Sequence, residues 1–247
     1  MKAGTVTAGV AACAVASFLV LLGFSSVVMA QGAGTVTHLA GTLSAQKQDG
    51  QRRLLGTQSA VVPGDLLATE AETYARIKFV DGAEVVLRPN SQMRIEDYRY
   101  PEAKPESGSA ILSMLRGGFR AITGLIGKAR PENVSVRTPT ATIGIRGTHL
   151  GGQICQGDCV GLSDASGQAL EDGLHVDVVE GAIVVSNSAG QISLGAGQFG
   201  FVRNLNSLPE LVPPARGFQV GVPPGIARND TGGRGIGQNR DPECVTP

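Results

Sequence analysis

Four cysteines and three histidines are the side chains best suited to redox or metal chemistry in this sequence of 247 residues. Cys155 and Cys159 enclose Gln-Gly-Asp, which favours a turn, so their spacing predicts a disulfide that closes a small loop. A metal site is the alternative, but no second cysteine pair and no histidine pair stands at ligand spacing. Cys244, in a polar segment near the chain end, is free, bonds a second chain, or competes for one of the other two.

Enzymatic chemistry is not predicted. His38, His149 and His175 are widely separated, and no nucleophile elbow, zinc-binding helix motif or close carboxylate pair accompanies them. The run 195–200 matches a dinucleotide fingerprint, but a strand pattern follows it instead of the helix that would hold a pyrophosphate. Zero net charge and the absence of tryptophan also exclude a basic, base-stacking nucleic-acid binder. We therefore expect no cofactor, no metal, no nucleic acid and no small-molecule substrate.

The N-terminal segment predicts export. Residues 3–30 carry no charge, Lys2 precedes them, and Val28-Met29-Ala30 forms a small-x-small pattern before Gln31. We expect a signal helix that is cleaved between Ala30 and Gln31. The alternative is an uncleaved anchor, because about 20 apolar residues suffice to span a bilayer.

The elements that position the remaining motifs are short strands. Apolar residues alternate with polar ones in many short segments, which predicts an all-β protein. These segments are 75–79, 85–87, 93–95, 134–136, 143–145, 176–178, 183–185, 192–194 and 199–201. Asp81-Gly82 between two of them predicts a hairpin or a solenoid corner.

Composition divides the rest of the chain. We expect a β domain over residues 31–205 and a disordered tail over residues 206–247, where the apolar period stops and prolines and glycines accumulate. Residues 110–128 are compatible with an apolar helical face. Their four glycines would each cost about 1 kcal/mol in a helix, however, so strands with a bulge are preferred.

Several stretches, taken in order, resemble the periplasmic domain of the FecR family, the iron-dicitrate regulator type, over about residues 33–202. The most specific is Arg137-Thr-Pro-Thr-Ala-Thr-Ile-Gly-Ile-Arg-Gly-Thr148. The others are 34–41, 62–69, 77–82, 87–91, 115–119, 179–181 and 194–198.

The resemblance implies a β-helix or solenoid domain and a non-enzymatic periplasmic module that signals by binding another envelope protein through strand edges and loops. Only Met1 and Lys2 precede the apolar segment, so direct regulation of a cytoplasmic sigma factor is not expected. The periplasm is the predicted compartment, with inner-membrane anchoring if the signal segment stays. The alternative function is a structural or adhesive envelope component associated with the cell wall.

The family-motif residues are interpreted as structural. Turn geometry explains them better than calcium binding, because the spacing of acidic ligands that calcium needs is absent. They are Gly64, Asp65, Asp81, Gly82, Thr138, Pro139, Gly144, Arg146, Gly147, Thr148, Glu180 and Gly181. Arg146 stands in an apolar run, so we expect a buried guanidinium clamped by Asp65 or Glu180, with contact to a ligand as the alternative. Arg88 is expected on a surface turn.

Overall fold

The structure is a computed structural model that describes Met1 and residues 32–227. The predicted cleavage site at Ala30 and Gln31, the rest of the signal segment after Met1, and residues 228–247 with Cys244 lie outside the described residues. Within the described part, no helix is long and apolar enough to cross a membrane.

Fifteen strands run through residues 32–227, which confirms the prediction of a mostly β protein. They are β1 (Gly34–Ala40), β2 (Leu43–Gln46), β3 (Arg52–Leu55), β4 (Ala60–Val61), β5 (Leu66–Thr69), β6 (Tyr74–Phe79), β7 (Glu84–Leu87), β8 (Gln92–Arg99), β9 (Ser109–Ile122), β10 (Val134–Arg137), β11 (Thr142–Cys155), β12 (Gly173–Asn187), β13 (Gly190–Gly195), β14 (Phe199–Val202) and β15 (Glu210–Val212). Two short helices, α1 (Leu125–Ala129) and α2 (Pro224–Ala227), complete the described part with three single-turn 3-10 helices (Pro105–Ser107, Pro131–Asn133 and Pro214–Arg216).

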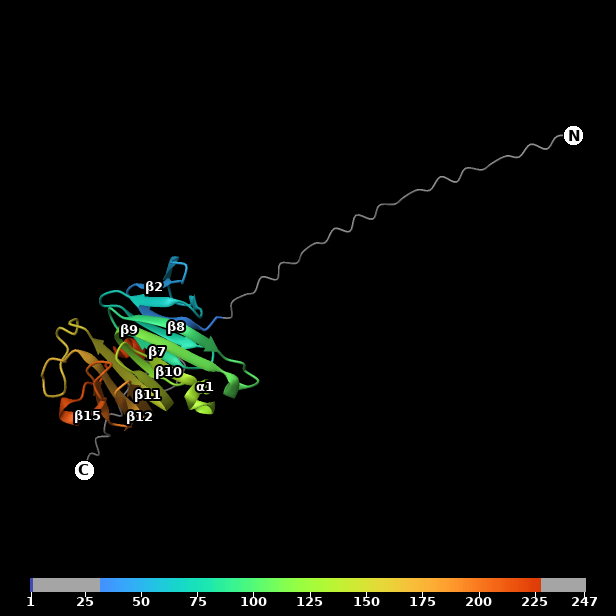
Figure 1. Cartoon of the computed structure of the whole chain (residues 1–247). Coiled ribbons are helices and arrows are strands. Elements are labelled where there is room, and N and C mark those ends of the chain that lie inside the picture. The colour runs from blue at the N-terminus through green and yellow to red at the C-terminus, as the bar shows by residue number, and fades with distance from the viewer. Residues whose placement is uncertain (2–31, 228–247) are drawn as a thin grey trace, which may run out of the picture. The chain divides into compact units, whose positions relative to one another are not determined.

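The strands form one forked sheet. The main path is β15-β14-β12-β11-β10-β9-β7-β6-β1-β4, and a second branch, β8-β5-β2-β3, also joins at β9. Figure 1 shows β9 in the middle of the molecule, between the blue N-terminal strands and the orange C-terminal strands. Each strand pair in the described part is antiparallel except β10 with β9. A β-helix stacks parallel rungs, so the structure does not confirm the expected solenoid. Asp81-Gly82 joins the β6–β7 hairpin instead.

The fork occurs where β9 changes partners. Residues 109–116 of β9 pair with β8, and residues 119–122 pair with β7. Gly117, between these two parts, has a φ of 78°. A Cβ atom at this position would lie 2.6 Å from Cα of Ser91, so only glycine fits the junction.

The space between the two branches holds the hydrophobic core. Leu43 and Leu67 from one branch pack in the same cluster as Ile77 and Leu87 from the other, and all four are fully buried. Phe119 of β9 belongs to this cluster as well. Burial of aliphatic side chains between the branches therefore holds the two halves of the sheet together.

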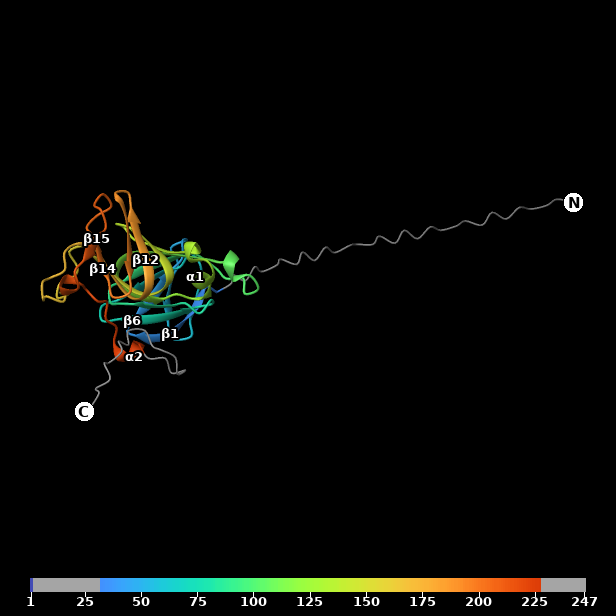
Figure 2. The same cartoon turned by 90° about the horizontal axis from the view of Figure 1, so that it is seen from below.

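The expected disordered tail is wrong for residues 206–227. β15 pairs with β14, and Phe218, Val220 and Ile226 are buried. We call residues 213–227 the C-terminal strap. The strap crosses the outer face of the sheet, which is the face that points away from the hydrophobic core. Figure 2 shows the last turn of the strap, α2, beside β6 and β1. Apolar side chains at alternate positions make this proline- and glycine-rich segment a cover for the sheet.

Candidate functional site

Five residues from five strands form a row across the outer face of the sheet. The register pairs Arg76 with Val86, Val86 with Arg120, Arg120 with Gly151, and Gly151 with Asp177. Directly opposed residues in a sheet point to the same face, so all five lie on one side. We call these five residues the cross-strand row. Its neighbours along each strand, such as Ile77 and Phe119, face the core.

Arg120 and Asp177 form the most buried ion pair of the described residues. Nη1 and Nη2 of Arg120 donate to Oδ2 of Asp177 at 2.7 and 2.9 Å, and both side chains are at most 3% exposed. Burial lowers the pKa of Arg120 and raises that of Asp177, and the mutual attraction opposes both shifts. Two charge-assisted hydrogen bonds to the same carboxylate oxygen replace part of the hydration that both groups lose.

Arg76 repeats this arrangement at the other end of the row. Its Nε donates to Oε2 of Glu84 at 3.1 Å, and its Nη2 forms a salt bridge with the same oxygen. Arg76 is 1% exposed although it lies on a strand face that alternates away from the core. The outer face of the sheet is therefore a second buried layer with two charges of each sign.

His149 extends the Arg120 pair. Nε of Arg120 donates to Nε2 of His149 at 3.3 Å, so the imidazole is neutral and accepts at that nitrogen. Burial, followed by repulsion from Arg120, lowers the pKa of His149 to about 4.

A pH dependence of stability follows from His149. Between pH 6.5 and 4 the unfolded chain binds this proton and the folded chain does not, so stability falls as the pH drops through this window. We expect His149→Gln, which keeps an acceptor, to remove about 1–2 kcal/mol of that decline, because the ring is partly solvated. Urea unfolding at pH 7 and pH 4.5 measures it. Equal declines in the wild type and the variant would contradict the assignment.

The predicted disulfide is present. Cys155, the last residue of β11, is bonded to Cys159, with an S–S distance of 2.00 Å. The bond closes the start of the 156–172 loop, which leads into β12. Among the described residues, no three His, Cys, Asp or Glu side chains are grouped as metal ligands.

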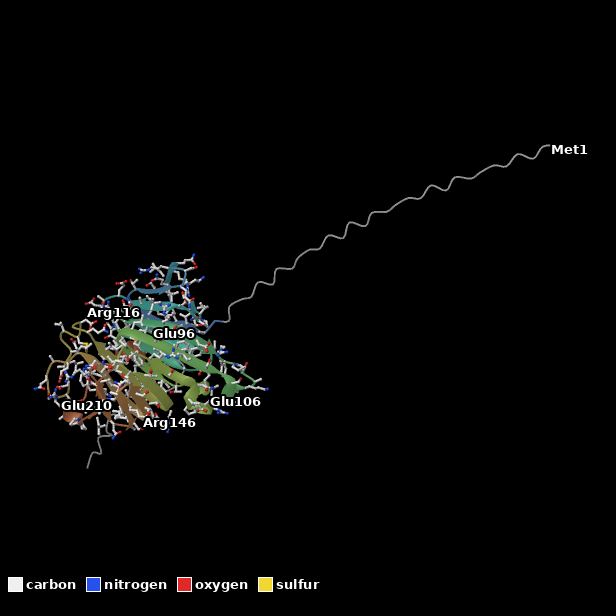
Figure 3. The ribbon with its side chains drawn as sticks, in the orientation of Figure 1. Met1, Glu96, Glu106, Arg116, Arg146 and Glu210 are labelled. Atoms are coloured by element: carbon white, nitrogen blue, oxygen red, sulfur yellow. A yellow bond between two sulfur atoms is a disulfide. The ribbon has the colours of Figure 1, made fainter. Side chains whose placement is uncertain are left out.

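A cleft of about 210 Å³ lies between this loop and β15. We call it the β15 cleft. Its lining residues include Leu170, Glu171, His175, Phe201, Arg203 and Leu211. Figure 3 shows Glu210 of β15 at the periphery, on the side of the molecule that carries the loop. The cleft thus opens beside a strand that pairs on one side only, with β14, in the described chain.

Charged pairs border the cleft, and a tilted pair of aromatic rings lines it. Arg203 contacts Glu171 at 2.8 Å, and the ring of His175 lies 4.7 Å from that of Phe201. Nε of Arg216 donates to Asp164 at 2.6 Å, and hydrogen bonds from Ser166 and Arg216 hold the pKa of Asp164 at about 2. The lining of the cleft therefore combines apolar side chains with charged side chains of both signs.

Asp65 and Asp81 lie in the turns predicted from the sequence. Each carboxylate also binds a side chain from another part of the chain. The backbone N–H of Val62 donates to Oδ2 of Asp65 at 2.9 Å, and Arg53 contacts this fully buried carboxylate at 2.7 Å. Asp81 accepts from the hydroxyl of Tyr98 at 2.5 Å. Burial, followed by the charge of Asp81, raises the pKa of Tyr98. Gly64 and Gly82 sit beside these aspartates with φ values of 90° and 82°.

The threonines of the most specific motif fix its backbone. Thr138 begins the turn that Pro139 continues, and its Oγ1 accepts from the N–H of Ala141 at 3.0 Å. Thr148 is buried, and its N–H donates to Oγ1 of Thr123 at 3.0 Å. Gly144 lies within β11, where a Cβ would meet only ordinary contacts. These residues hold the strand ends in place.

The expected clamp at Arg146 is wrong. Arg146 is exposed, and Figure 3 shows it at the lower margin of the folded part. Glu180 is also exposed, and Asp65 bonds Arg53. The alternation of β11 places Ile143 and Ile145 in the core, so the side chain of Arg146 must point outward.

Arg88 is not on a surface turn as expected. It is half-buried, and its Nη1 donates to Oε1 of Gln153 at 2.8 Å. Its guanidinium also lies 5.8 Å from the ring of Phe218 in the strap. Arg88 therefore connects Gln153 of β11 with Phe218 of the strap.

The close backbone approach in this motif occurs at Gly181 rather than at Gly147. Gly147 has a φ of 59°, and a Cβ there would meet nothing. At Gly181, with a φ of 81°, a Cβ would lie 2.4 Å from the carbonyl oxygen of Gly147. The two glycines face each other where the β11–β12 register shifts.

Comparison with known proteins gives one family. The sequence model described as "FecR protein" matches residues 65–184. This segment belongs to the FecR family. The FecR domain contains the whole cross-strand row, whereas β13, β14, β15 and the strap follow it in the sequence.

Solved structures give weaker likenesses, and no curated protein matches the chain. Two crystal structures from Parabacteroides distasonis, described as an anti-sigma factor candidate, are 18% and 19% identical, with TM-scores of 0.42 and 0.43. In each case the alignment covers 60% of this chain and 58% of the other. A "cell surface anchoring domain" is 31% identical over 25% of this chain and 80% of its own length, with a TM-score of 0.24.

Proposed function

We propose that this chain is an exported, non-enzymatic signalling module that contains a FecR domain and binds another protein of the cell envelope. The observation that carries the proposal is the match of residues 65–184 to the FecR family. The charge-free segment 3–30, with its small-x-small end before Gln31, supports export to the periplasm. The module needs no cofactor in this role.

The β15 cleft is the surface that best fits an extended partner segment. β15 has a free edge in the described chain, and its Leu211 is 58% exposed. A segment added beside an edge strand gains main-chain hydrogen bonds, and neighbouring pockets select its side chains. The charged rim with Arg203 and Glu171 would fix the register of that segment.

Capture from an envelope fraction tests the proposal. We expect the wild type to retain one protein in stoichiometric amount, and Leu211→Asp to reduce this retention at least tenfold, because a carboxylate replaces an exposed apolar anchor. Leu54→Asp is the matched control: Leu54 is 76% exposed on the edge strand β3, outside the cleft. It should leave retention unchanged.

Two results would contradict the proposal. Equal losses for the Leu211 and Leu54 variants would show that the cleft is not the binding surface. Sedimentation of the chain with purified cell wall, without a protein partner, would favour the structural or adhesive role instead.

Export has its own test. We expect mature protein from the native host to begin at Gln31, so its intact mass should lack residues 1–30. A mass that retains these residues would show an anchored chain and place the FecR domain at the inner membrane.

A further inference from the structure

The strap lies on the cross-strand row as an extended segment. Phe218 and Val220 are buried, whereas Gln219 between them and Gly221 after them are exposed, which is the alternation of a strand. No regular secondary structure is formed over residues 217–223. The strap therefore presents every second side chain to the row without being part of the sheet.

The row contacts the backbone of the strap at two points. The N–H of Val220 donates to Oδ1 of Asp177 at 3.0 Å, and Nη1 of Arg76 donates to the carbonyl oxygen of Ile226 at 3.5 Å. Such contacts are independent of side-chain identity. They would be available to the backbone of any segment that follows the same path.

Gly151 provides the room for this path. A Cβ atom at Gly151 would lie 2.7 Å from Cβ of Val220 and 2.2 Å from Oδ1 of Asp177. Because Gly151 has no side chain, a space remains between Arg120 and Asp177, and the side chain of Val220 occupies this space. At the other end of the row, Val86 and Ile226 pack in one apolar cluster.

Charge also matches between the groove and the segment. The row and Glu84 together carry two arginines and two acids that neutralise each other, and residues 217–226 carry no charge. A charged side chain placed on this buried layer would lose its hydration without an available counter-charge. The face thus selects an uncharged segment.

We infer that the cross-strand row is the floor of a binding groove for an extended, uncharged segment of another protein, with aliphatic side chains at alternate positions, and that the strap occupies this groove in cis. All row residues belong to the FecR domain, and the strap begins beyond it. None of the row residues lines the β15 cleft, although Pro213 and Arg216 at the start of the strap do, so the groove itself does not depend on the binding surface proposed there.

A tethered strap competes strongly with a partner. A segment linked through a short connection acts at an effective concentration on the order of mM. A partner segment must therefore exceed the affinity of the strap, or bind after the strap has been loosened. Because the strap is covalently tethered, only a tight-binding partner segment can displace it from the groove.

The test uses the full chain and a labelled synthetic peptide of residues 213–227. In the chain, Val220→Ser with Ile226→Ser removes two strap anchors and leaves the row intact. We expect this double variant to bind the peptide at least tenfold more tightly than the wild type does. A peptide methylated on the amide nitrogen of Val220 should bind at least tenfold more weakly than the unmodified one, because Asp177 loses its donor.

Circular dichroism checks that the double variant is folded, and Ile226→Ser alone repeats the test if it is not. Equal peptide binding by variant and wild type, or by methylated and unmodified peptides, would overturn the inference. Dimers that exchange straps, detected by size-exclusion chromatography with light scattering, would also overturn it, because a second copy would then be the occupant.

Discussion

Asp177→Ala is expected to lower the free energy of unfolding by about 3–5 kcal/mol, because it leaves the guanidinium of Arg120 buried without a counter-charge. The N–H of Val220 loses its acceptor at the same time. Chemical denaturation monitored by circular dichroism measures the change. A loss of this size is a large part of the usual stability of a domain.

Two controls separate the buried charge from side-chain loss in general. Arg120→Met with Asp177→Asn removes both charges and keeps an acceptor for Val220, so at least half of the loss should be recovered. Glu132→Ala breaks the exposed pair with Arg130 and should not change the melting temperature measurably. If the double variant is as unstable as Asp177→Ala, the uncompensated charge is not the cause.

Gly117→Ala is the second change with a large expected effect, about 3–4 kcal/mol of destabilisation. The methyl group would lie 2.6 Å from Cα of Ser91 and 2.9 Å from the carbonyl oxygen of Asn90. These are backbone atoms, so the strand ends must move apart, and the positive φ adds its own cost. The melting temperature and denaturant midpoint of the variant measure this effect.

Gly147→Ala is the matched control for that experiment. Gly147 also has a positive φ, but a Cβ there meets no atom within 4 Å. Only the backbone cost of about 1–2 kcal/mol should then appear. If the two alanine variants are equally stable, the close contacts at the fork do not contribute to the destabilisation of Gly117→Ala.

The strands could be predicted because their local pattern carries the information. Each predicted segment lies in a strand, since the period-two alternation of Ala75, Ile77 and Phe79 reflects a face that really points to the core. The cost of four glycines in a helix favoured strands over residues 110–128; β9 confirms this prediction up to Ile122, but it is wrong beyond Gly124, where Leu125–Ala129 form α1. Strand order could not be predicted, because the partners of β9 are set by contacts distant in sequence.

The cross-strand row was missed because of the error about residues 206–227. The alternation of β6 places Arg76 on the face away from the core, and that placement is right. A face away from the core is expected to meet water, but the strap covers it and makes Arg76 and Arg120 buried. A clue was present in the alternation of Phe218, Val220 and Val222 within the proline-rich segment.

The error at Arg146 is the opposite one, because this residue was expected to be buried and is exposed. Its apolar neighbours suggested a buried charge, although two residues adjacent in a strand point to opposite faces. Thr148, two residues further on, is buried in spite of its hydroxyl, because Oγ1 donates to the carbonyl oxygen of Ala182 at 2.6 Å. Burial in this motif follows strand geometry and register shifts, which residue types alone do not indicate.

The forked topology determines which fragment of this chain can be produced for experiments. A fragment limited to residues 65–184 would lack β1, which pairs with β6, and β2, which pairs with β5. It would also lack the strap over Arg76 and Asp177. Such a fragment would expose long strand edges and apolar surface, which favour aggregation. Recombinant protein should therefore begin no later than Gly32 and end no earlier than Ala227.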